Sequence, residues 1–447
     1  MKLSGAITIL LASTLVITTT TTTDALPTNN NGKIVVPLHT DTRFRPNPSI
    51  SIRNAQARYS RFLNNPTVSN KIAVDSDRKN LKSQANKGTI SLKSIKNDIQ
   101  YVGKVNVGTP PQELELNFDT GSSDLWFVST LCKNCDDYNT QFNPNKSTTF
   151  DWGTRQEWNI QYGDGSTAGG IVGYDTVDLG GFPIEHQAVE LATHETQMDS
   201  VVHGILGLGF PELCTIPGTI TPLENLVKQG LIKDSMFSFS LGHYLHGGGG
   251  ELIFGGMNTE RYVGDLTSFP VENVEGYWGI RLMSATIGEE LISFDEIVPK
   301  IPHMNSPMNA LNNHNNAKEV NVLPGVLDTG TTLMIFPELI ANIIAKKYNA
   351  TSNDDGTFGI TCDSNQLPEL ILNFGTASYK VLSESLIYYN DNNGNCLAGF
   401  AKAKFPFVIL GDVFLKNVYT VFDYSVPPTI KLAQAVSPPQ YTNNNDF

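Results

Sequence analysis

Two copies of a short acidic motif are the residues best suited to chemistry in this 447-residue chain. Asp119 begins one Asp-Thr-Gly triplet after an apolar stretch, and Asp328 begins a second in the same setting. Hydroxyl residues follow both triplets, with Ser122 in the first copy and Thr331 in the second. A single Asp-Thr-Gly usually marks only a turn, because Asp and Gly favour turn conformations. Two copies instead predict a pair of carboxylates that act together.

Paired carboxylates have a defined use in hydrolysis. Two carboxylates in one site cannot both ionise comfortably, so one pKa rises, the other falls, and the pair holds one proton. A water between them can lose a proton to the ionised carboxylate while the other protonates a peptide carbonyl. Gly121 and Gly330 would let backbone N–H groups approach the carboxylates, and the hydroxyls of Thr120 and Thr329 can tie the two loops together.

A second repeated element shows that the whole setting is duplicated. Gly207 ends a Gly-Ile-Leu-Gly stretch 88 positions after Asp119, and Gly411 ends a Val-Ile-Leu-Gly stretch 83 positions after Asp328. A paired motif at matched spacing indicates two related halves. We therefore predict two similar lobes that face each other across the carboxylate pair.

The elements that must position this pair are expected to be short strands. Hydrophobic residues make up 40% of the chain, charged residues only 17%, and Gly occurs 38 times. Leu114, Leu116 and Phe118 alternate with Glu115 and Asn117, which is the period of a half-buried strand. Turn signals recur at strand-like spacing. The expected fold class is all-β and bilobal, with few short helices.

Two helices are nevertheless predicted. Thr221-Pro222-Leu223-Glu224 is a capping box with Pro at the first helical position, and Gly230 would end that helix. Pro337 opens the second helix, whose apolar face would carry Leu339, Ile340, Ile343 and Ile344.

The amino-terminal segment has the features of a secretory signal. Lys2 precedes the apolar stretch 6–17, and small residues near Ala25 offer a cleavage site, so residues 1–25 are interpreted as a signal peptide. The apolar stretch is too short to span a bilayer. We expect a secreted protein, with the vacuole as the alternative, and no membrane or nucleic-acid partner.

Charge separates the following segment from the rest of the chain. Residues 26–96 hold 13 Lys/Arg against 3 Asp/Glu, whereas residues 97–447 hold 17 against 40. A basic segment beside an acidic body favours association of the two parts over nucleic-acid binding. We interpret residues 26–88 as a basic propeptide, 89–271 as the amino-terminal lobe with Asp119, and 272–447 as the carboxy-terminal lobe with Asp328.

Five cysteines fit a secreted chain with disulfides. Cys132 and Cys135 are close enough to close a small loop, and Cys362 and Cys396 can close a larger one. Cys214 is then left over as a buried thiol. The Cys-x-x-C spacing also occurs in redox and zinc sites, but no second such pair or His pair accompanies it.

Other hydrolytic chemistries lack their motifs. The chain has no His-Glu-x-x-His and no Gly-x-Ser-x-Gly, which disfavours a metalloprotease and a serine hydrolase. His243 and His246 lie in a Gly-rich loop and are expected to be exposed and inert. The Gly-rich stretch 204–209 lacks the downstream Lys of a phosphate loop.

The chain resembles the pepsin-type aspartic proteases, and among them the rhizopuspepsin-like fungal enzymes. The resemblance runs from about residue 101 to the carboxyl terminus. It is carried by the following stretches: VGTPP at 107–111, FDTGSSDLW at 118–126, QYGDGS at 161–166, GILGLG at 204–209, VLDTGTT at 326–332 and ILGDVFL at 409–415.

This resemblance implies a role for each matching residue. Asp119 and Asp328 would be the catalytic pair of an endopeptidase that acts on proteins and peptides at acid pH, without metal, nucleotide or other cofactor. The residues that support the pair would be Thr120, Gly121, Ser122, Thr329, Gly330 and Thr331.

The resemblance also implies substrate and propeptide contacts. Tyr162, Gly163 and Asp164 would form a hairpin flap over bound peptide, and Trp126 would pack behind it. A propeptide residue near Tyr59 would pair with the catalytic carboxylates; Arg58 is the best match, with Arg61 as the alternative. The resemblance further implies a monomer whose first partner is its own propeptide.

Three features depart from that pattern or refine it. Asp164 would accept Lys before the scissile bond in a cleft that otherwise prefers large apolar residues, although it can equally serve only the hairpin turn. Residues 297–320 read as an Asn-rich surface insertion. Asn145 and Asn349 begin sequences that fit glycosylation sequons.

Overall fold

The computed structural model describes residues 48–59, 88–95, 98–133, 135, 140–161, 167–196, 202–246, 248–274, 276–298, 322–391 and 394–436. The chain divides into one unit of Met1–Val36 and another of Pro37–Phe447, and every statement below concerns the second unit. The predicted signal peptide, most of the predicted propeptide and nearly all of the 297–320 insertion lie outside the described residues.

Strands dominate the described residues, which confirms the all-β prediction. One large sheet contains the strands β1 (Gly88–Ile95), β2 (Gln100–Val107), β3 (Gln112–Asp119), β4 (Leu125–Val128), β5 (Glu157–Gln161), β6 (Thr167–Asp178), β7 (Pro183–Thr196), β8 (Gly204–Gly207), β9 (Met236–Leu241), β10 (Gly250–Phe254), β11 (Tyr262–Pro270), β26 (Val418–Asp423) and β27 (Thr429–Ala435). Their spatial order is β11-β27-β26-β9-β10-β1-β2-β3-β8-β4-β7-β6-β5.

Three smaller sheets belong to the second half of the chain. The first contains β12 (Glu272–Val274), β13 (Tyr277–Leu282), β16 (Leu323–Leu327), β25 (Val408–Leu410), β17 (Met334–Pro337) and β24 (Phe400–Ala403). The second contains β15 (Glu290–Ser293), β14 (Ser284–Ile287), β20 (Leu370–Asn373) and β21 (Ser378–Val381). The third contains β18 (Thr351–Ser352), β19 (Phe358–Ile360), β23 (Cys396–Ala398) and β22 (Ile387–Asn390).

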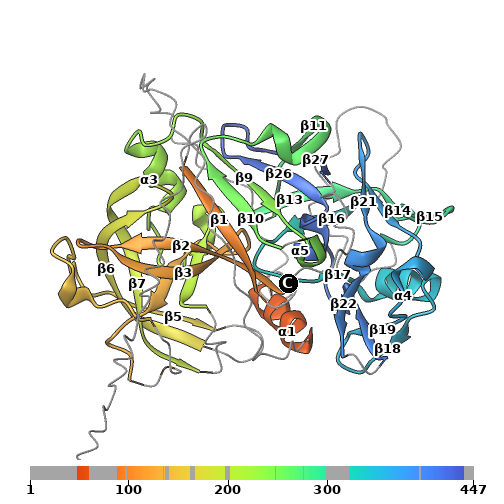
Figure 1. The fold of residues 1–447 in the computed structure, drawn as a ribbon, viewed down its shortest axis with the longest axis horizontal. Coiled ribbons are helices and arrows are strands. Elements are labelled where there is room, and N and C mark those ends of the chain that lie inside the picture. The colour runs from red at the N-terminus through yellow and green to blue at the C-terminus, as the bar shows by residue number, and fades with distance from the viewer. Residues whose placement is uncertain are drawn as a thin grey trace, which may run out of the picture. The chain divides into compact units, whose positions relative to one another are not determined.

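Helices are few among the described residues, as Figure 1 shows. The α-helices are α1 (Pro48–Arg58), α3 (Pro222–Lys228), α4 (Glu338–Lys347) and α5 (Asp412–Leu415). Single 3-10 turns are η1 (Pro144–Lys146), η2 (Pro211–Leu213), η3 (Tyr244–His246), η4 (Thr259–Arg261), η7 (Ser364–Gln366) and η8 (Ser383–Leu386). Figure 1 shows the strands β2 to β7 on one side, β18 to β22 on the other, and α1 between them.

The sequence duplication corresponds to a duplicated strand arrangement. In the first half, β8 lies parallel to β3, with Gly207 opposite Asp119, and antiparallel to β4. In the second half, β25 lies parallel to β16, with Leu410 opposite Leu327, and antiparallel to β17. In both halves, therefore, the strand that leads into the Asp-Thr-Gly triplet pairs in parallel with the strand that carries the second repeated element. This repeat supports the bilobal architecture of the predicted fold class.

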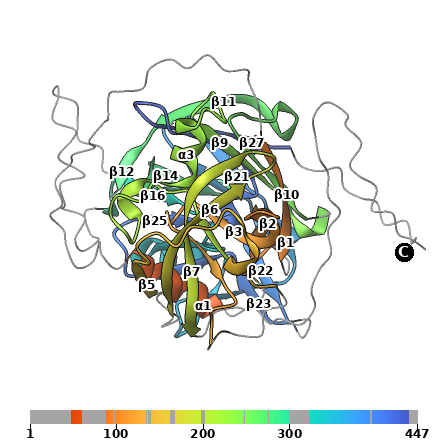
Figure 2. The same cartoon turned by 90° about the vertical axis from the view of Figure 1, so that its left-hand side faces the viewer.

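The large sheet also crosses the predicted lobe boundary at residues 271 and 272. β26 pairs with β9, and β27 pairs with β11, so the last strands of the chain complete a sheet begun in its first half. Gly88, the last residue of the predicted propeptide, begins β1, which lies between β10 and β2. Figure 2 shows β1, β9, β10 and β27 together from a second direction.

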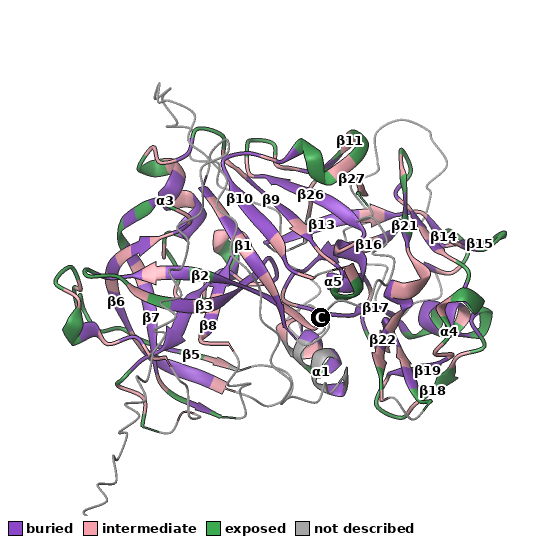
Figure 3. Cartoon of the chain, in the orientation of Figure 1, coloured by how far each residue is buried: buried purple, intermediate pink, exposed green. Residues whose placement is uncertain are grey.

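The alternation predicted for β3 accounts for most of its burial. Leu114, Leu116 and Phe118 are buried, and Glu115 is half-buried. Asn117 is buried as well, and its side-chain amide compensates for the lost contact with water by donating a hydrogen bond to the Tyr101 carbonyl at 3.2 Å. The strand is therefore covered on both faces where it approaches Asp119. Figure 3 shows by its colours that buried residues predominate in the central strands.

Most buried apolar residues form one continuous core, but a smaller cluster lies apart from it. We call this second group the tryptophan cluster; it consists of Trp126, Trp158, Ala168, Val172 and Ala192. Its members come from β4 to β7, so it stabilises the outer part of the first lobe by apolar burial.

The sequence predicted the start of α3 correctly but the buried face of α4 only in part. The capping box of α3 is present, with Thr221 and Glu224 exchanging hydrogen bonds. The apolar face predicted for α4 is wrong at Leu339, which is 41% exposed. The helix begins at Glu338, and its packed face carries Ile340, Ala341, Ile344 and Ala345.

The expectation that His243 and His246 are exposed is wrong. His243 is buried, and its Nδ1 accepts a hydrogen bond from the Leu245 N–H at 3.2 Å. Burial lowers the pKa of His243 to about 2, so this imidazole is neutral. Nε2 of His246 lies 2.7 Å from Glu384 Oε1. The turn η3 places both rings against neighbouring elements, which a Gly-rich sequence does not reveal.

Candidate active site

The two motif aspartates lie at corresponding strand ends. Asp119 is the last residue of β3, and Asp328 follows the last residue of β16. Both side chains are fully buried, and the Leu208 N–H donates to the Asp119 carbonyl at 2.8 Å. Two carboxyl groups are thereby held inside the protein, where an unpaired charge would be costly.

Each carboxyl group receives the same pair of hydrogen bonds from its own loop. The Gly121 N–H donates to Asp119 Oδ1 at 2.8 Å, and Ser122 Oγ donates to Oδ2 at 2.6 Å. In the other copy the Gly330 N–H donates to Asp328 Oδ1 at 2.9 Å, and Thr331 Oγ1 donates to Oδ2 at 2.6 Å. These donors stabilise the ionised carboxylates and fix their orientation.

The threonines of the two triplets join the loops beneath the carboxyl groups. The N–H of each threonine donates to the hydroxyl of the other at 3.0 Å. The Thr120 hydroxyl donates to the Leu327 carbonyl at 2.9 Å, and the Thr329 hydroxyl donates to the Phe118 carbonyl at 2.6 Å. This symmetric, buried network locks the two halves at one separation.

The glycines of the triplets are required by close approach. A Cβ added to Gly121 would lie 2.5 Å from Asp328 Oδ1, and a Cβ on Gly330 would collide with the Asp119 carboxyl group. Each loop therefore passes against the other loop's carboxylate, which is possible only without a side chain.

Arg58, the last residue of α1, contacts both carboxyl groups. Its Nη1 lies 2.8 Å from Asp328 Oδ2 and 3.2 Å from Asp119 Oδ1, and its Nη2 lies 3.2 Å from Asp119 Oδ2. The Arg58 side chain is 10% exposed. A guanidinium held this way places one positive charge between two buried carboxyl groups, so it balances one ionised carboxylate and favours a proton on the other.

Tyr59 completes the contact between α1 and the carboxyl groups. Its hydroxyl donates to Asp328 Oδ2 at 3.0 Å, and its ring is fully buried. The ring centroid lies 4.7 Å from that of Tyr277, 5.3 Å from that of Phe407 and 6.0 Å from that of Phe405. We call these three partner rings the aromatic socket. Tyr277 also donates to the Arg58 carbonyl at 3.1 Å.

The environment moves the two carboxyl groups in opposite directions. Burial raises the pKa of Asp119 above its ordinary value, although Arg58 opposes the rise. Burial also acts to raise the pKa of Asp328, but Arg58, Thr331 and the Gly330 N–H together bring it below its ordinary value. One member thus tends to hold a proton while the other tends to stay ionised, which is the arrangement general acid–base chemistry needs.

The predicted flap lies outside the described residues. Tyr162, Gly163 and Asp164 fall between β5 and β6, which pair antiparallel with Gln161 opposite Thr167. Trp126 is buried on β4 at 6.0 Å from the Trp158 ring.

The remaining predicted sites are distributed over both halves of the chain. Disulfides join Cys132 to Cys135 and Cys362 to Cys396, and Cys214 is a free, half-buried thiol. Asn145 and Asn349 are both exposed. Arg61 lies outside the described residues.

Sequence reasoning missed the aromatic socket. Phe405 and Phe407 lie just before the Val-Ile-Leu-Gly stretch at 408–411, and Tyr277 begins β13. The apolar residues flanking that stretch were the only available signal, because nothing in the sequence states which rings converge. No group of residues in the described part of the chain is arranged to hold a metal ion.

The chain matches known proteases along most of its length. A family model described as eukaryotic aspartyl protease matches residues 100–435. Rhizopuspepsin-2 of Rhizopus niveus is 41% identical over 397 residues, which cover 88% of this chain and 91% of that protein. Syncephapepsin of Syncephalastrum racemosum is 38% identical and covers 86% and 88%. Pepsin A of Sus scrofa is 34% identical and covers 73% and 79%.

This chain therefore belongs to the eukaryotic aspartyl protease family. Within the family it is a pepsin-like enzyme similar to the rhizopuspepsins, which confirms the resemblance found in its sequence. It is an aspartic-type endopeptidase that acts on proteins and peptides.

Proposed function

We propose that Asp119 and Asp328 are the catalytic pair of this endopeptidase. The observation that carries the proposal is their pairing: two fully buried carboxyl groups, with matching donor sets, contact one guanidinium nitrogen. Once Arg58 is gone, a water takes up the space between the carboxyl groups. The ionised carboxyl removes a proton from this water as the water oxygen bonds to the carbonyl carbon, and the protonated carboxyl gives its proton to the carbonyl oxygen, which forms a tetrahedral diol. The carboxyl that took the proton from water then passes it to the amide nitrogen, one diol hydroxyl returns a proton to the other carboxyl, and the C–N bond breaks to give a carboxylic acid and an amine.

Asp119→Asn and Asp328→Asn test this assignment. Either change removes the ability to share one proton while it preserves side-chain shape, so each should abolish nearly all peptidase activity. The double variant should lose little more, because the carboxyl groups act as a unit. Asp265→Asn is the matched control, since Asp265 is exposed on β11. Near-normal cleavage by either motif variant, with an unchanged circular-dichroism spectrum, would refute the assignment.

The second part of the proposal is that the chain is made as a zymogen. Arg58 and Tyr59 occupy the carboxyl groups, and α1 also binds the second half of the chain, with Ser49 Oγ donating to Asp355 Oδ2 at 2.6 Å. A peptide carbonyl cannot reach carboxyl groups that are covered in this way. Residues 26–88 would act as the inhibitory propeptide, with a basic charge that matches the acidic body.

The third part concerns substrate preference. The aromatic socket buries the Tyr59 ring directly beside Asp328, which supports a preference for large apolar side chains next to the scissile bond. Asp164 would add a charge-assisted hydrogen bond to a Lys on the amino side of that bond. Serving only as a hairpin-turn residue is the alternative role for Asp164.

The last part is destination. Residues 1–25 would direct the chain to the secretory pathway, where the two disulfides are stable and Asn145 and Asn349 are open to glycosylation. No helix among the described residues is long and apolar enough to cross a membrane. Secretion as a monomer is the proposed outcome, with vacuolar delivery as the alternative that cell fractionation would distinguish.

A further inference from the structure

An acidic side chain lies among apolar residues in the first lobe, away from the catalytic carboxyl groups. Glu190 is on β7 and is only 3% exposed. It faces Trp126 across the β4–β7 register and Val172 across the β6–β7 register, and both belong to the tryptophan cluster. A carboxylate in such surroundings loses its hydration without compensation.

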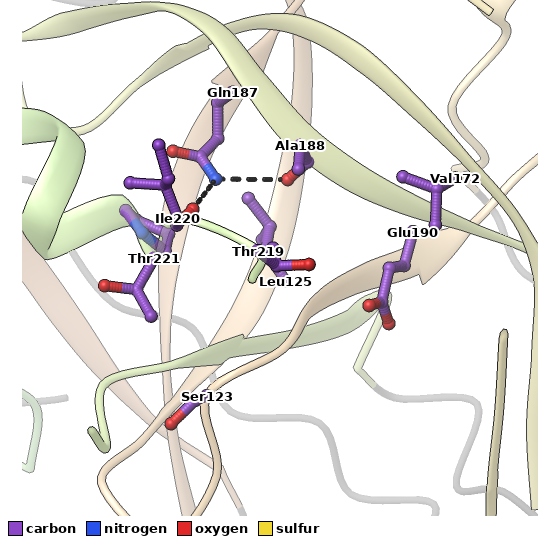
Figure 4. A pocket seen from close by; sticks show the side chains of 10 residues that line it. Ser123, Leu125, Val172, Gln187, Ala188, Glu190, Thr219, Ile220 and Thr221 are labelled. Atoms are coloured by element: carbon purple, nitrogen blue, oxygen red, sulfur yellow. Dashed lines mark hydrogen bonds between the residues drawn. The ribbon is translucent and has the colours of Figure 1, made fainter. Parts of the chain in front are cut away.

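Two polar side chains that line the same cavity as Glu190, those of Gln187 and Ser123, form hydrogen bonds with other groups. Its Oε2 has no hydrogen-bond partner among the described residues. The Gln187 amide donates to the Ala188 and Ile220 carbonyls, and its oxygen accepts from Asn225, as Figure 4 shows for the first two bonds. The Ser123 hydroxyl donates to the Phe210 carbonyl. None of these groups is available to stabilise an ionised Glu190.

The space beside Glu190 is too small to suggest a ligand. The cavity measures about 10 Å³ and is lined by Ser123, Leu125, Gln187, Glu190 and Thr221, among others. That volume is at the lower limit for a single water molecule. The carboxyl group therefore belongs to the packed interior and is not part of a binding site.

The charged group that acts on Glu190 is itself acidic. Asp124 lies on the loop before β4, and its charge acts on Glu190. The pKa of the neighbouring Cys214 thiol is raised by burial and by the charges of four acidic residues, namely Asp124, Glu190, Glu224 and Glu212. Burial, reinforced by Asp124, raises the pKa of Glu190 well above its ordinary value.

We propose that Glu190 is a pH-sensitive element that sets the upper pH limit at which the first lobe stays folded. At acid pH the neutral carboxyl packs in the apolar cluster. As the pH rises, the group releases its proton to solvent, and a negative charge appears next to Asp124; among the residues that the structure describes, Glu190 forms no ion pair that would balance it. The lobe then favours unfolded forms in which the carboxylate is hydrated.

Unfolding at this position would also disable catalysis. Asp124 and Ser123 follow directly after the Asp119 loop, and the Gly207 N–H donates to the Asp124 carbonyl at 2.8 Å. If Asp124 moved, it would loosen β8, which pairs with β3 and has Gly207 opposite Asp119. A molecule that unfolds at high pH and does not refold should therefore stay inactive after return to acid pH.

The direction of the effect follows from proton linkage. A carboxyl group with a raised pKa in the folded state binds more protons folded than unfolded, so its stabilising effect is complete below its unfolded pKa. The effect declines as the pH rises toward the folded pKa. One such proton changes the folding equilibrium constant by about tenfold for each pH unit in that window.

The test compares the full-length wild-type chain with Glu190→Gln and Glu185→Gln. Gln keeps the shape of the protonated carboxyl and cannot ionise, whereas Glu185 is exposed on the same strand. Each protein is incubated from pH 5 to pH 9, and folding is followed by the fluorescence of the buried Trp126 and Trp158. Peptidase activity is measured after return to acid pH.

We expect the Glu190→Gln unfolding midpoint to lie about one pH unit or more above that of the wild type. Glu185→Gln should match the wild type. If Glu190→Gln does not fold, Glu190→Leu replaces it. Equal midpoints for wild type and the Glu190 variant would overturn the proposal, as would a wild-type stability to urea that does not fall over this pH range. Fluorescence reports the outcome even if the proposed catalytic pair is wrong.

Discussion

Arg58 offers the sharpest test of the zymogen proposal, because one guanidinium contacts both buried carboxyl groups. Removing one partner of a buried ion pair costs about 3–5 kcal/mol. Arg58→Ala should cost less, since the abandoned carboxyl groups can share a proton. We therefore expect the inhibited form to lose about 2–3 kcal/mol, which corresponds to roughly 30- to 150-fold in the closing equilibrium.

The sign of the pH dependence follows from the role of Arg58. Its charge acts to lower the pKa of both carboxyl groups and opposes the rise that burial causes at Asp119, so the site binds fewer protons with Arg58 in place than after its release. Closure is present at higher pH and is lost as the pH falls. Without Arg58 the carboxyl groups take up a proton more readily, so activation should begin at a higher pH. If one proton is linked to opening, a loss of about 2–3 kcal/mol shifts the midpoint by about 1.5 to 2 pH units.

The assay uses purified precursors of wild type, Arg58→Ala, Arg58→Lys and Arg53→Ala. Each is held at a series of pH values, and conversion is measured by gel electrophoresis and by cleavage of a quenched fluorescent peptide. Arg53 is the matched control because it is an exposed arginine on α1. Arg58→Lys keeps a charge but loses the forked contact, so its midpoint should be intermediate. An Arg58→Ala midpoint equal to that of wild type would refute the reasoning.

Two further predictions concern substrate recognition. Asp164→Thr should lower kcat/KM for a peptide with Lys before the cut by about 1–2 kcal/mol, the range expected for one charge-assisted hydrogen bond, while sparing the matched Phe peptide. Equal losses for both peptides would show that Asp164 only shapes the flap. Phe407→Ala should lower kcat/KM roughly tenfold for peptides with Tyr or Phe beside the scissile bond, through loss of ring packing. Peptides with Ala there should be unaffected, and a uniform loss would contradict the substrate role of the aromatic socket.

Local patterns predicted the elements well where a single strand or cap determined the outcome. The alternation in β3 and the capping box of α3 depend on neighbouring residues, so the sequence contains the necessary information. Leu339 shows the limit: its helical position is compatible with an apolar face, but Ile340, Ala341 and the residues one turn later face the second lobe's core instead. Which side of a helix is covered depends on what packs against it.

The histidines and Glu190 show the same limit for polar groups. His243 was expected to be exposed because its loop is rich in Gly, yet the fold covers it. Glu190 attracts no attention in a strand that also contains Glu185, Glu195 and His194. Only the tertiary structure separates the buried carboxyl of Glu190 from the exposed one of Glu185, because burial depends on neighbours that are distant in sequence.

The sequence by itself determined the family, the duplicated architecture and the identity of the two motif aspartates. Those features are carried by short stretches whose residue types are constrained by turns, close approach and strand period. The tertiary structure decided which groups meet: Arg58 between the two carboxyl groups, the three rings around Tyr59, and Glu190 in the tryptophan cluster. These contacts join residues as far apart as Tyr59 and Phe407, which are 348 positions apart in the chain. Their energies depend on burial and distance, which a linear pattern does not specify.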